Sequence, residues 1–318
     1  MKKKILILGG TGFVGTNLAK EIDKKKFRVT ATFYSNKKFY KVKDVKYKKV
    51  NLLKKIPLKI FDKVDIVYMC AANSSGAKIM AEKPLSHLTP NLIMNTLVLE
   101  KAQQAKVKKF VFISSSTVYP VSSKAMSEND VNYKYFDKYF IVGWMKTFSE
   151  IMCKMYSEKI RQKLQTIVIR PGNLYGPYDK FDPEKAKVVP SLIQKFLSNK
   201  KEIIVWGDGK DIKDFMYVED FCKIIIIITE KLNKSSVVNV ASGKNINIRE
   251  ILEQLKKITK KNAKITFDIN KPQMIKFRKI SVNKMKKIIG KKFKFTKFKE
   301  GLSKTINWYK NDYKQNSI

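Results

Sequence analysis

Three glycines near the start of the chain, Gly9, Gly12 and Gly15, are spaced as in turns that bind phosphate. An apolar run at residues 5–8 precedes them and is typical of a parallel strand buried on both faces, and a segment typical of a helix follows. Glycines in this position let backbone N–H groups approach phosphate oxygens, and the helix dipole favours their negative charge. The pattern therefore predicts a nucleotide pyrophosphate site where the first strand ends.

A phosphate site of this kind needs a sheet to position it, and the rest of the chain has the required pattern. Apolar runs that predict strands alternate with helical patterns, notably at 13–24, 85–105 and 139–158. The expected strands cover residues 4–9, 27–33, 47–50, 65–71, 109–115, 165–170 and 237–240. This alternation indicates an α/β fold with a doubly wound parallel Rossmann sheet, whose ligands bind at the carboxyl ends of the strands.

The composition is consistent with one large α/β domain and a smaller second unit, since the chain has 318 residues and 44% of them are hydrophobic. The formal net charge of +40 would suit a nucleic-acid partner. Only five of the 67 basic residues are arginines, however, whereas proteins that bind nucleic acids rely on arginine for bidentate contacts. The lysines are also spread along the whole chain, so we expect a solvated basic surface and no nucleic-acid partner.

The cysteines and the single histidine, His87, cannot build an ordinary zinc site, because Cys70, Cys153 and Cys222 lack metal-binding spacing. No metal is therefore expected. Free thiols and the lack of a signal peptide predict a reducing, cytoplasmic location. The apolar run at 224–228 is far shorter than the ~20 residues that a membrane span needs, so we expect no membrane partner.

The residues after the second expected strand bear on the choice of cofactor. An acidic side chain there accepts hydrogen bonds from the adenosine ribose and selects NAD, whereas a 2′-phosphate needs cations or hydroxyls. This chain has no carboxylate at residues 33–38 and carries Ser35, Lys37 and Lys38 instead. The sequence therefore favours NADP, with NAD as the alternative.

A series of motifs resembles the extended short-chain dehydrogenase/reductase family, and within it the nucleotide-sugar epimerases, dehydratases and reductases. The motifs are the glycine turn at 9–15, Asn51-Leu52, Ala71-Ala72, the serine-rich segment at 114–120, the crossing at 170–177, and residues 206–209 and 214–220. The resemblance implies a cofactor domain at 1–170 and 205–245, and a nucleotide-sugar domain at 171–204 and 246–318. The residues that it implies for cofactor binding are Gly9, Thr11, Gly12, Phe13, Val14, Gly15, Asn51, Leu52, Ala71, Ala72, Asn91, Lys146 and Pro171.

Within this family the chain is most similar to the GDP-L-fucose synthases. The similarity rests on residues 173–184 and 188–190, on residues 115–120 and on Lys271-Pro272. It implies a nucleotide-diphosphate sugar as substrate, GDP-linked and with a 4-keto group, and a homodimer formed by the helices expected at 85–105 and 139–158. The substrate contacts that it implies are Asn173, Lys187, Val188, Trp206, Lys213, Lys271 and Arg278.

The redox centre of this family combines a serine with Tyr-x-x-x-Lys on one helix, and the tyrosine exchanges a proton with the sugar as hydride moves. Ser115 and Lys146 match this centre, but the residue four positions before Lys146 is Val142, which has no exchangeable proton. The GDP-L-fucose synthases use a Cys and a His for epimerisation, and the matching residues here are Thr117 and Lys187. A threonine hydroxyl is a poor proton shuttle, whereas a lysine can act as acid or base if burial lowers its pKa.

Three interpretations of this departure are open. The chain can be an active NADP-dependent enzyme with a different proton donor, which would be Tyr139, Ser115 or Lys187. It can be a catalytically impaired relative that binds cofactor or sugar nucleotide. It can also be an engineered variant in which Val142 replaces the tyrosine of an ordinary enzyme.

Overall fold

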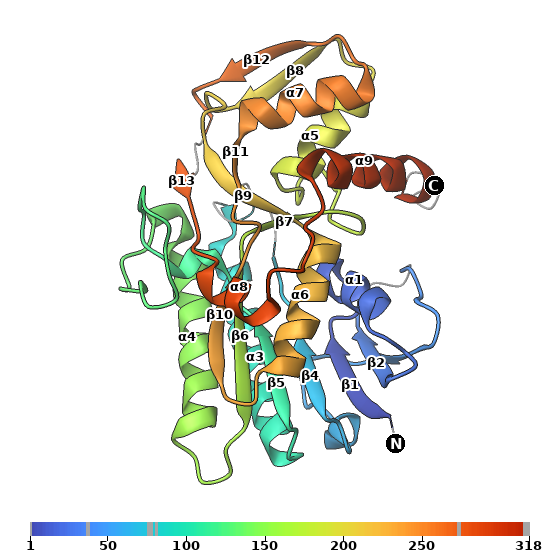
Figure 1. Cartoon of the computed structure of the whole chain (residues 1–318), viewed down its shortest axis with the longest axis vertical. Helices are drawn as coiled ribbons and strands as arrows, with labels where there is room; N and C mark the ends of the chain where they lie inside the picture. The colour runs from blue at the N-terminus through green and yellow to red at the C-terminus, as the bar shows by residue number, and fades with distance from the viewer. Residues whose placement is uncertain (1, 36–38, 75–78, 80–81, 272–274, 314–318) are drawn as a thin grey trace.

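The computed structural model describes residues 2–35, 39–74, 79, 82–271 and 275–313, except for the side chain of Tyr139. Within these residues, the larger part is a parallel sheet of seven strands in the order β10-β6-β5-β4-β1-β2-β3 (Figure 1). Its strands are β1 (Lys3–Leu8), β2 (Phe27–Phe33), β3 (Val45–Lys49), β4 (Ile66–Met69), β5 (Lys109–Ile113), β6 (Gln165–Pro171) and β10 (Ser236–Val240). All of the strands expected from the sequence lie in this sheet, which confirms the doubly wound parallel fold.

The strand order reverses at β1, which pairs with β2 on one side and with β4 on the other. In a doubly wound sheet this reversal opens a crevice at the carboxyl ends of the strands, and dinucleotides bind there. Leu8 of β1 is paired with Met69 of β4. The turn at Gly9 and the loop at Ala71 therefore leave the sheet beside each other.

Helices cover both faces of the large sheet, and each face has its own apolar core. One face packs against α1 (Phe13–Glu21), α6 (Val218–Lys231) and α8 (Asn283–Ile289), and the other against α3 (Thr89–Gln104) and α4 (Phe140–Glu158). Burial on both faces explains why the strands are apolar without alternation. The apolar run at 224–228 lies within α6. Among the described residues, no helix combines the length and the apolar character needed to cross a membrane.

A smaller unit lies at the carboxyl edge of the large sheet, above it in Figure 1, and has a third apolar core. Its elements are β7 (Asn173–Tyr175), α5 (Val188–Leu197), β8 (Glu202–Trp206), β9 (Ile212–Tyr217), β11 (Asn245–Asn247), α7 (Ile248–Thr259), β12 (Lys264–Asp268), β13 (Phe277–Arg278) and α9 (Phe298–Trp308). The end of the chain contributes to both units, since Met285 of α8 lies in a core of the large sheet and Leu302 of α9 in the third core. The division into two domains at the boundaries given above stays a prediction.

The helix expected at 85–105 is interrupted, which corrects the prediction at its start. A 3-10 turn, η2 (Pro84–His87), comes first, and α3 begins at Thr89. Pro90 lies in the first turn of α3, where its missing N–H costs nothing. The other short helical turns are η1 (Leu58–Phe61), η3 (Ser116–Val118), η4 (Asp137–Tyr139) and η5 (Tyr309–Tyr313).

Candidate active site

The glycine turn connects β1 to α1 and has the geometry of a phosphate site. Gly9 has a φ of +78°, and a Cβ there would lie 2.6 Å from the Cα of Ala71. A Cβ on Gly15 would lie 2.2 Å from the carbonyl oxygen of Gly9, so the helix can approach the turn only because this residue is glycine. Gly12 is the N-cap of α1, and no side chain of the described residues caps this end of the helix. The backbone N–H groups of the first turn are therefore available to an anion.

The rest of this turn is placed as a dinucleotide requires. Thr11 and Phe13 flank Gly12, and Val14 packs against the core of the large sheet. Ala71 and Ala72 follow β4 at the point where the strand order reverses. These residues fit the pyrophosphate of a dinucleotide, and their direct contacts with it stay predictions.

Asn91 supports the loop after β4. Its Oδ1 accepts a hydrogen bond from the backbone N–H of Asn73 at 2.8 Å, and its Nδ2 donates to the carbonyl oxygens of Asn73 at 2.9 Å and His87 at 2.8 Å. The side chain is buried and fully occupied by these contacts. Asn91 therefore fixes the position of this loop, and its predicted contact with a cofactor stays a prediction.

The adenosine end of the site follows β2 and β3. Ser35 lies two residues after β2 and is exposed, while the predicted contacts Lys37 and Lys38 lie outside the described residues. After β3, Leu52 is buried, and Asn51 closes a turn by accepting a hydrogen bond from the N–H of Leu53 at 3.0 Å.

Lys146 is the lysine of the predicted redox site. Its Nζ donates to the carbonyl oxygen of Ile113 at 2.8 Å and lies 4.8 Å from the centre of the Phe112 ring. Burial lowers the pKa of this amine to about 8; the charge of Glu150 opposes the shift and that of Lys187 adds to it. The lysine is thus fixed against the end of β5, where a nicotinamide ribose would lie in a sheet of this type.

The serine-rich turn after β5 completes the redox site. Ser115 is the N-cap of η3, and its Oγ accepts a hydrogen bond from the N–H of Thr117 at 3.1 Å. The hydroxyl of Thr117 is buried and has no partner within the described residues. Val142 lies one helical turn before Lys146, so both side chains share one face of α4. That Val142 stands where the family has its tyrosine stays a prediction from the resemblance.

A buried charge network stands behind this turn, and the sequence analysis assigned it no function. Arg170, at the end of β6, donates to both carboxylate oxygens of Glu150, with a shortest distance of 2.6 Å. The Ser114 hydroxyl donates to the same carboxylate. Arg170 also donates to the hydroxyl of Tyr119 at 2.9 Å, and Tyr119 donates to Asn239 at 2.6 Å. Two signals were available in the sequence. Arg170 ends an apolar strand, and Glu150 follows Lys146 by one helical turn.

The substrate loop runs from β7 to α5 and contains two groups able to exchange protons. Lys187 is the N-cap residue of α5, with an exposed side chain, and Val188 begins the helix. Asp179 is buried, and its burial raises the pKa of the carboxyl to about 6 although the charge of Lys187 opposes the rise. The sequence analysis missed Asp179, because burial of a loop carboxylate leaves no local sequence signal.

The crossing between the two units places Pro171 and Asn173 next to the redox site. Pro171 is the last residue of β6, and Asn173 begins β7. The Nδ2 of Asn173 donates to the carbonyl oxygen of Asp214 at 3.0 Å. Asp214 in turn accepts the backbone N–H groups of Ser242 at 2.8 Å and Gly243 at 2.6 Å, which ties the smaller unit to the end of β10.

Two of the predicted substrate-binding cations are neighbours. Lys213 on β9 stands opposite Arg278 on β13, and both are buried. Lys213 pairs with Asp211 at 3.2 Å, and Arg278 donates to the carbonyl oxygen of Ser116 in the turn beside the redox site. The structure thus brings a pair of basic side chains together at the boundary between the two units, and their contact with a diphosphate stays a prediction.

The other two predicted substrate contacts, Trp206 and Lys271, lie near the ends of the paired strands β8 and β12. Trp206 ends β8 and is 48% exposed, and Asp268 of β12 is its partner in the register. The N–H of Lys271 donates to the carbonyl oxygen of the same aspartate at 3.4 Å. Both side chains are exposed, and their contact with a nucleotide base and its phosphates stays a prediction.

Residues 5–241 match the NAD dependent epimerase/dehydratase family. The chain belongs to this family. It is 30% identical to "Probable GDP-L-fucose synthase 1" of Oryza sativa subsp. japonica over 252 residues, which are 76% of this chain and 75% of the relative. It is 24% identical to "dTDP-4-dehydro-6-deoxy-D-allose reductase" of Streptomyces bikiniensis, over 97% of this chain and 96% of the relative.

A solved structure, "MoeE5 in complex with UDP-glucuronic acid and NAD", has the same fold. Its TM-score is 0.84 at 21% identity, with 99% of this chain and 100% of that chain covered. Members of the epimerase/dehydratase family are NAD(P)-dependent epimerases, dehydratases and reductases of nucleotide sugars, and the present chain is an enzyme of this type. The phosphate turn, Lys146 and Ser115 described above are consistent with this membership.

Proposed function

We propose that this family member is an NADP-dependent enzyme that acts on a GDP-linked 4-keto sugar, by epimerisation, by reduction of the keto group, or by both. The observation that carries the proposal is electrostatic: the charge of Lys187 in the substrate loop acts on Lys146 in the redox site. This effect supports a role for Lys187 as a proton donor that extends from the smaller unit toward the redox site. The choice of GDP is supported by the name of the rice relative and by the similarity at residues 173–184.

The residues that would hold the dinucleotide are those of the glycine turn, together with Lys146. When bound, the reduced nicotinamide supplies hydride to the keto carbon of the sugar. The first-turn N–H groups of α1 would bind the pyrophosphate, and Lys146, fixed against Ile113, would hold the ribose through its ammonium group. The choice of NADP is supported by residues 33–38, which offer a hydroxyl and two lysines but no carboxylate to the adenosine ribose.

Val142 cannot supply the proton that the sugar oxygen needs, and we assign this task to Lys187. Its Nζ–H bond breaks as the O–H bond of the product alcohol forms, and the resulting neutral amine takes a proton from solvent. Ser115 accepts its hydrogen bond through Oγ and keeps its own O–H free to donate to the same sugar oxygen. Tyr139, the third donor considered above, has its side chain outside the described part of the chain.

One incubation tests the proposed function. Purified protein is mixed with NADPH and a panel of 4-keto sugars linked to GDP, dTDP or UDP, and the products are identified by NMR. We expect turnover of the GDP-linked sugar, and a loss on the order of 10²–10⁴ in rate for Lys187→Met, because a positioned acid contributes about that much. Lys185→Met, an exposed lysine in the same loop, is the matched control and should keep full activity. Full activity of Lys187→Met would contradict the assignment.

A second candidate function is binding without turnover, which the combination of Val142 and Thr117 favours, since neither side chain is a useful proton shuttle. This protein would bind NADPH and the sugar nucleotide tightly and form no product in the same incubation. A variant in which Val142 had been engineered in place of a tyrosine would give the same result. Natural relatives that carry valine at position 142 would exclude an engineered origin.

We further propose that the protein is a cytoplasmic homodimer. The three cysteines form no disulfide in the structure, which is consistent with a reducing compartment. One face of α4 presents an exposed apolar stripe, formed by Phe140, Trp144, Phe148, Ile151 and Met155. Their spacing of three and four residues makes this stripe continuous along the helix, as a helix–helix interface requires.

A further inference from the structure

Residues 176–180 form a short connection whose two ends are fixed in the smaller unit. Tyr175 before them and Phe181 after them are each 1% exposed and lie in the third apolar core. The backbone between these anchors is unusual at two residues, since Gly176 has a φ of +150° and Tyr178 a φ of +67°. A positive φ is rare for a tyrosine and is kept where the surrounding contacts hold it. The contacts made by the middle of this connection therefore need an explanation.

One side of the connection contacts α1 and the chain that follows β2. Asn17 of α1 donates to the carbonyl oxygen of Pro177 at 2.9 Å. The ring of Tyr178 packs against the ring of Tyr40 with centroids 5.2 Å apart. The ammonium group of Lys20, also on α1, lies 5.1 Å from the centre of the Tyr178 ring and 5.9 Å from that of the Tyr40 ring. A cation that contacts both rings stabilises the pair that they form.

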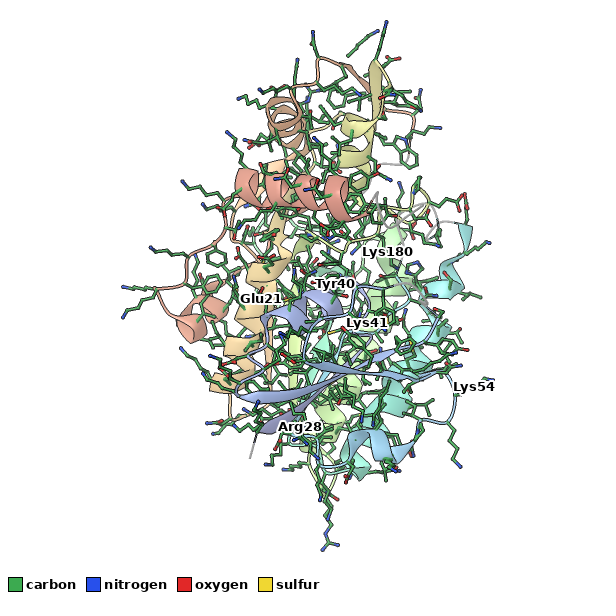
Figure 2. The ribbon with its side chains drawn as sticks, turned by 90° about the vertical axis from the view of Figure 1, so that its right-hand side faces the viewer. Glu21, Arg28, Tyr40, Lys41, Lys54 and Lys180 are labelled. Carbon is green, nitrogen blue, oxygen red and sulfur yellow. The ribbon has the colours of Figure 1, made fainter. Side chains whose placement is uncertain are left out.

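The other side of the connection contacts the loop after β4. The ammonium group of Lys180 donates to the carbonyl oxygen of Ser74, and Figure 2 shows Lys180 and Tyr40 on the same face of the molecule. The strands β2 and β4 are the two neighbours of β1, which ends in the glycine turn. The connection touches the chain after both neighbours and α1 between them. It therefore spans the crevice in which the pyrophosphate of a dinucleotide would lie.

We propose that residues 177–180 form a strap that closes the dinucleotide crevice and sets the rate at which the cofactor enters and leaves. The contact between Tyr40 and Tyr178 is the latch of this strap. The Tyr40 side chain is 51% exposed and Lys180 is exposed as well, so the contacts of the strap with the large unit are individually weak. The strap opens in its middle, while its buried ends stay in the apolar core. The proposal rests on the dinucleotide site and is independent of the sugar and of the proton donor.

A latch differs kinetically from a residue that binds the cofactor. Loss of a latch lets the cofactor enter and leave faster, so that the association and dissociation rate constants rise together and Kd changes little. Loss of a direct contact raises the dissociation rate constant and Kd, and leaves association unchanged. A contact that only joins the two units affects neither rate. The two rate constants together therefore distinguish the three roles.

The test measures both rate constants by stopped flow, with NADPH and in parallel with NADH, from the cofactor fluorescence that tryptophan excites. Release is started by an excess of the oxidised cofactor. We expect Tyr40→Ala and Tyr178→Ala each to raise both constants by about 3- to 10-fold, with Kd changed by less than about 2-fold, as the loss of one aromatic contact predicts. The double variant should match the single ones, because all three remove the same contact. Tyr133→Ala removes an exposed tyrosine that stacks on Trp144 of α4, and as the matched control it should keep both constants.

Lys180→Met tests the other side of the strap and should also raise both constants. Its control is Lys185→Met, an exposed lysine of the same loop that pairs with Asp182. Circular dichroism verifies that each variant is folded. Wild-type rates in Tyr40→Ala and Lys180→Met would overturn the proposal, and so would a rise in dissociation without a rise in association. Faster exchange in variants of a protein that turns over no sugar supports the strap and rejects the proposed function. Unchanged exchange in variants of a protein that turns over the GDP-linked sugar does the reverse.

Discussion

Glu150 and Arg170 form a buried, bidentate ion pair directly behind the redox site, with a shortest N–O distance of 2.6 Å. The carboxylate of Glu150 also accepts the hydroxyl of Ser114, the residue before Ser115. The position of the serine-rich turn after β5 therefore depends on a charge pair that is itself removed from solvent.

Breaking this pair should destabilise the protein strongly. Glu150→Gln removes one charge and leaves Arg170 buried without its partner, a change that typically costs about 3–5 kcal/mol. Urea unfolding followed by circular dichroism measures this loss. Glu300→Gln breaks an exposed pair with Lys304 and should cost less than about 1 kcal/mol. Equal losses in the two variants would show that the buried pair contributes nothing beyond a surface pair.

The relation between Val142 and Lys146 leads to a second prediction. Both side chains share a face of α4, so the hydroxyl of a tyrosine at position 142 would enter the redox site one turn before the lysine. We expect Val142→Tyr to raise the rate of 4-keto reduction by about 10²-fold or more, with little change in NADPH affinity. Single-turnover decay of NADPH fluorescence and a binding titration measure the two quantities.

Tyr139→Phe is the companion variant. If Tyr139 has taken over the proton transfer, Tyr139→Phe abolishes a robust native activity, and Val142→Tyr does not raise the rate. If another residue such as Lys187 donates the proton, Tyr139→Phe is silent, and Val142→Tyr raises the rate because it adds the acid that the family uses. The second result is the one that we expect, since Lys187 is the donor that we propose.

Cofactor choice gives a third prediction, for the loop after β2. Lys37→Ala combined with Lys38→Ala should weaken NADPH binding by roughly tenfold or more and leave NADH unchanged, because only NADPH carries the 2′-phosphate that charged donors bind. Isothermal titration with each cofactor measures both constants. Lys54→Ala, an exposed lysine after β3 that Figure 2 labels on the outside of the same unit, is the control. Equal affinity of the wild type for NADH and NADPH would refute the choice of NADP.

Much of the fold follows from local patterns in the sequence. The strands of the large sheet are apolar runs because both faces are buried, and the glycine turn is set by contacts that exclude a Cβ, such as the 2.6 Å approach at Gly9. The break before α3 was missed, because the apolar pattern continues through Leu88 while Pro90 decides where the helix can start. Hydrophobic periodicity shows which face of a helix is buried, but it does not show where a backbone N–H is missing.

The candidate site was predicted less completely, since several of its contacts join distant parts of the chain. Arg278 donates to the carbonyl oxygen of Ser116, a partner that no local pattern of either segment indicates. Gly143 resembles an ordinary helix glycine, yet a Cβ there would lie 2.6 Å from the ring of Tyr135, so its absence lets that ring pack on α4. Asp179 gains its shifted pKa only from burial in the folded loop. These features arise from tertiary packing.

The exposed stripe on α4 gives the last prediction, which concerns assembly. Phe148 and Met155 are 47% and 52% exposed, and in a homodimer built on this face both would be buried against the partner. Phe148→Glu combined with Met155→Glu would place unpaired carboxylates in that apolar interface, which is unfavourable by several kcal/mol. We therefore expect the wild type to sediment as a dimer at micromolar concentration and the double variant as a monomer with an unchanged circular dichroism spectrum. Ile269→Glu, at an exposed apolar residue of the smaller unit, should leave the dimer intact. A strictly monomeric wild type would contradict the proposed dimer. A double variant that is still a dimer would show that the interface lies on another face.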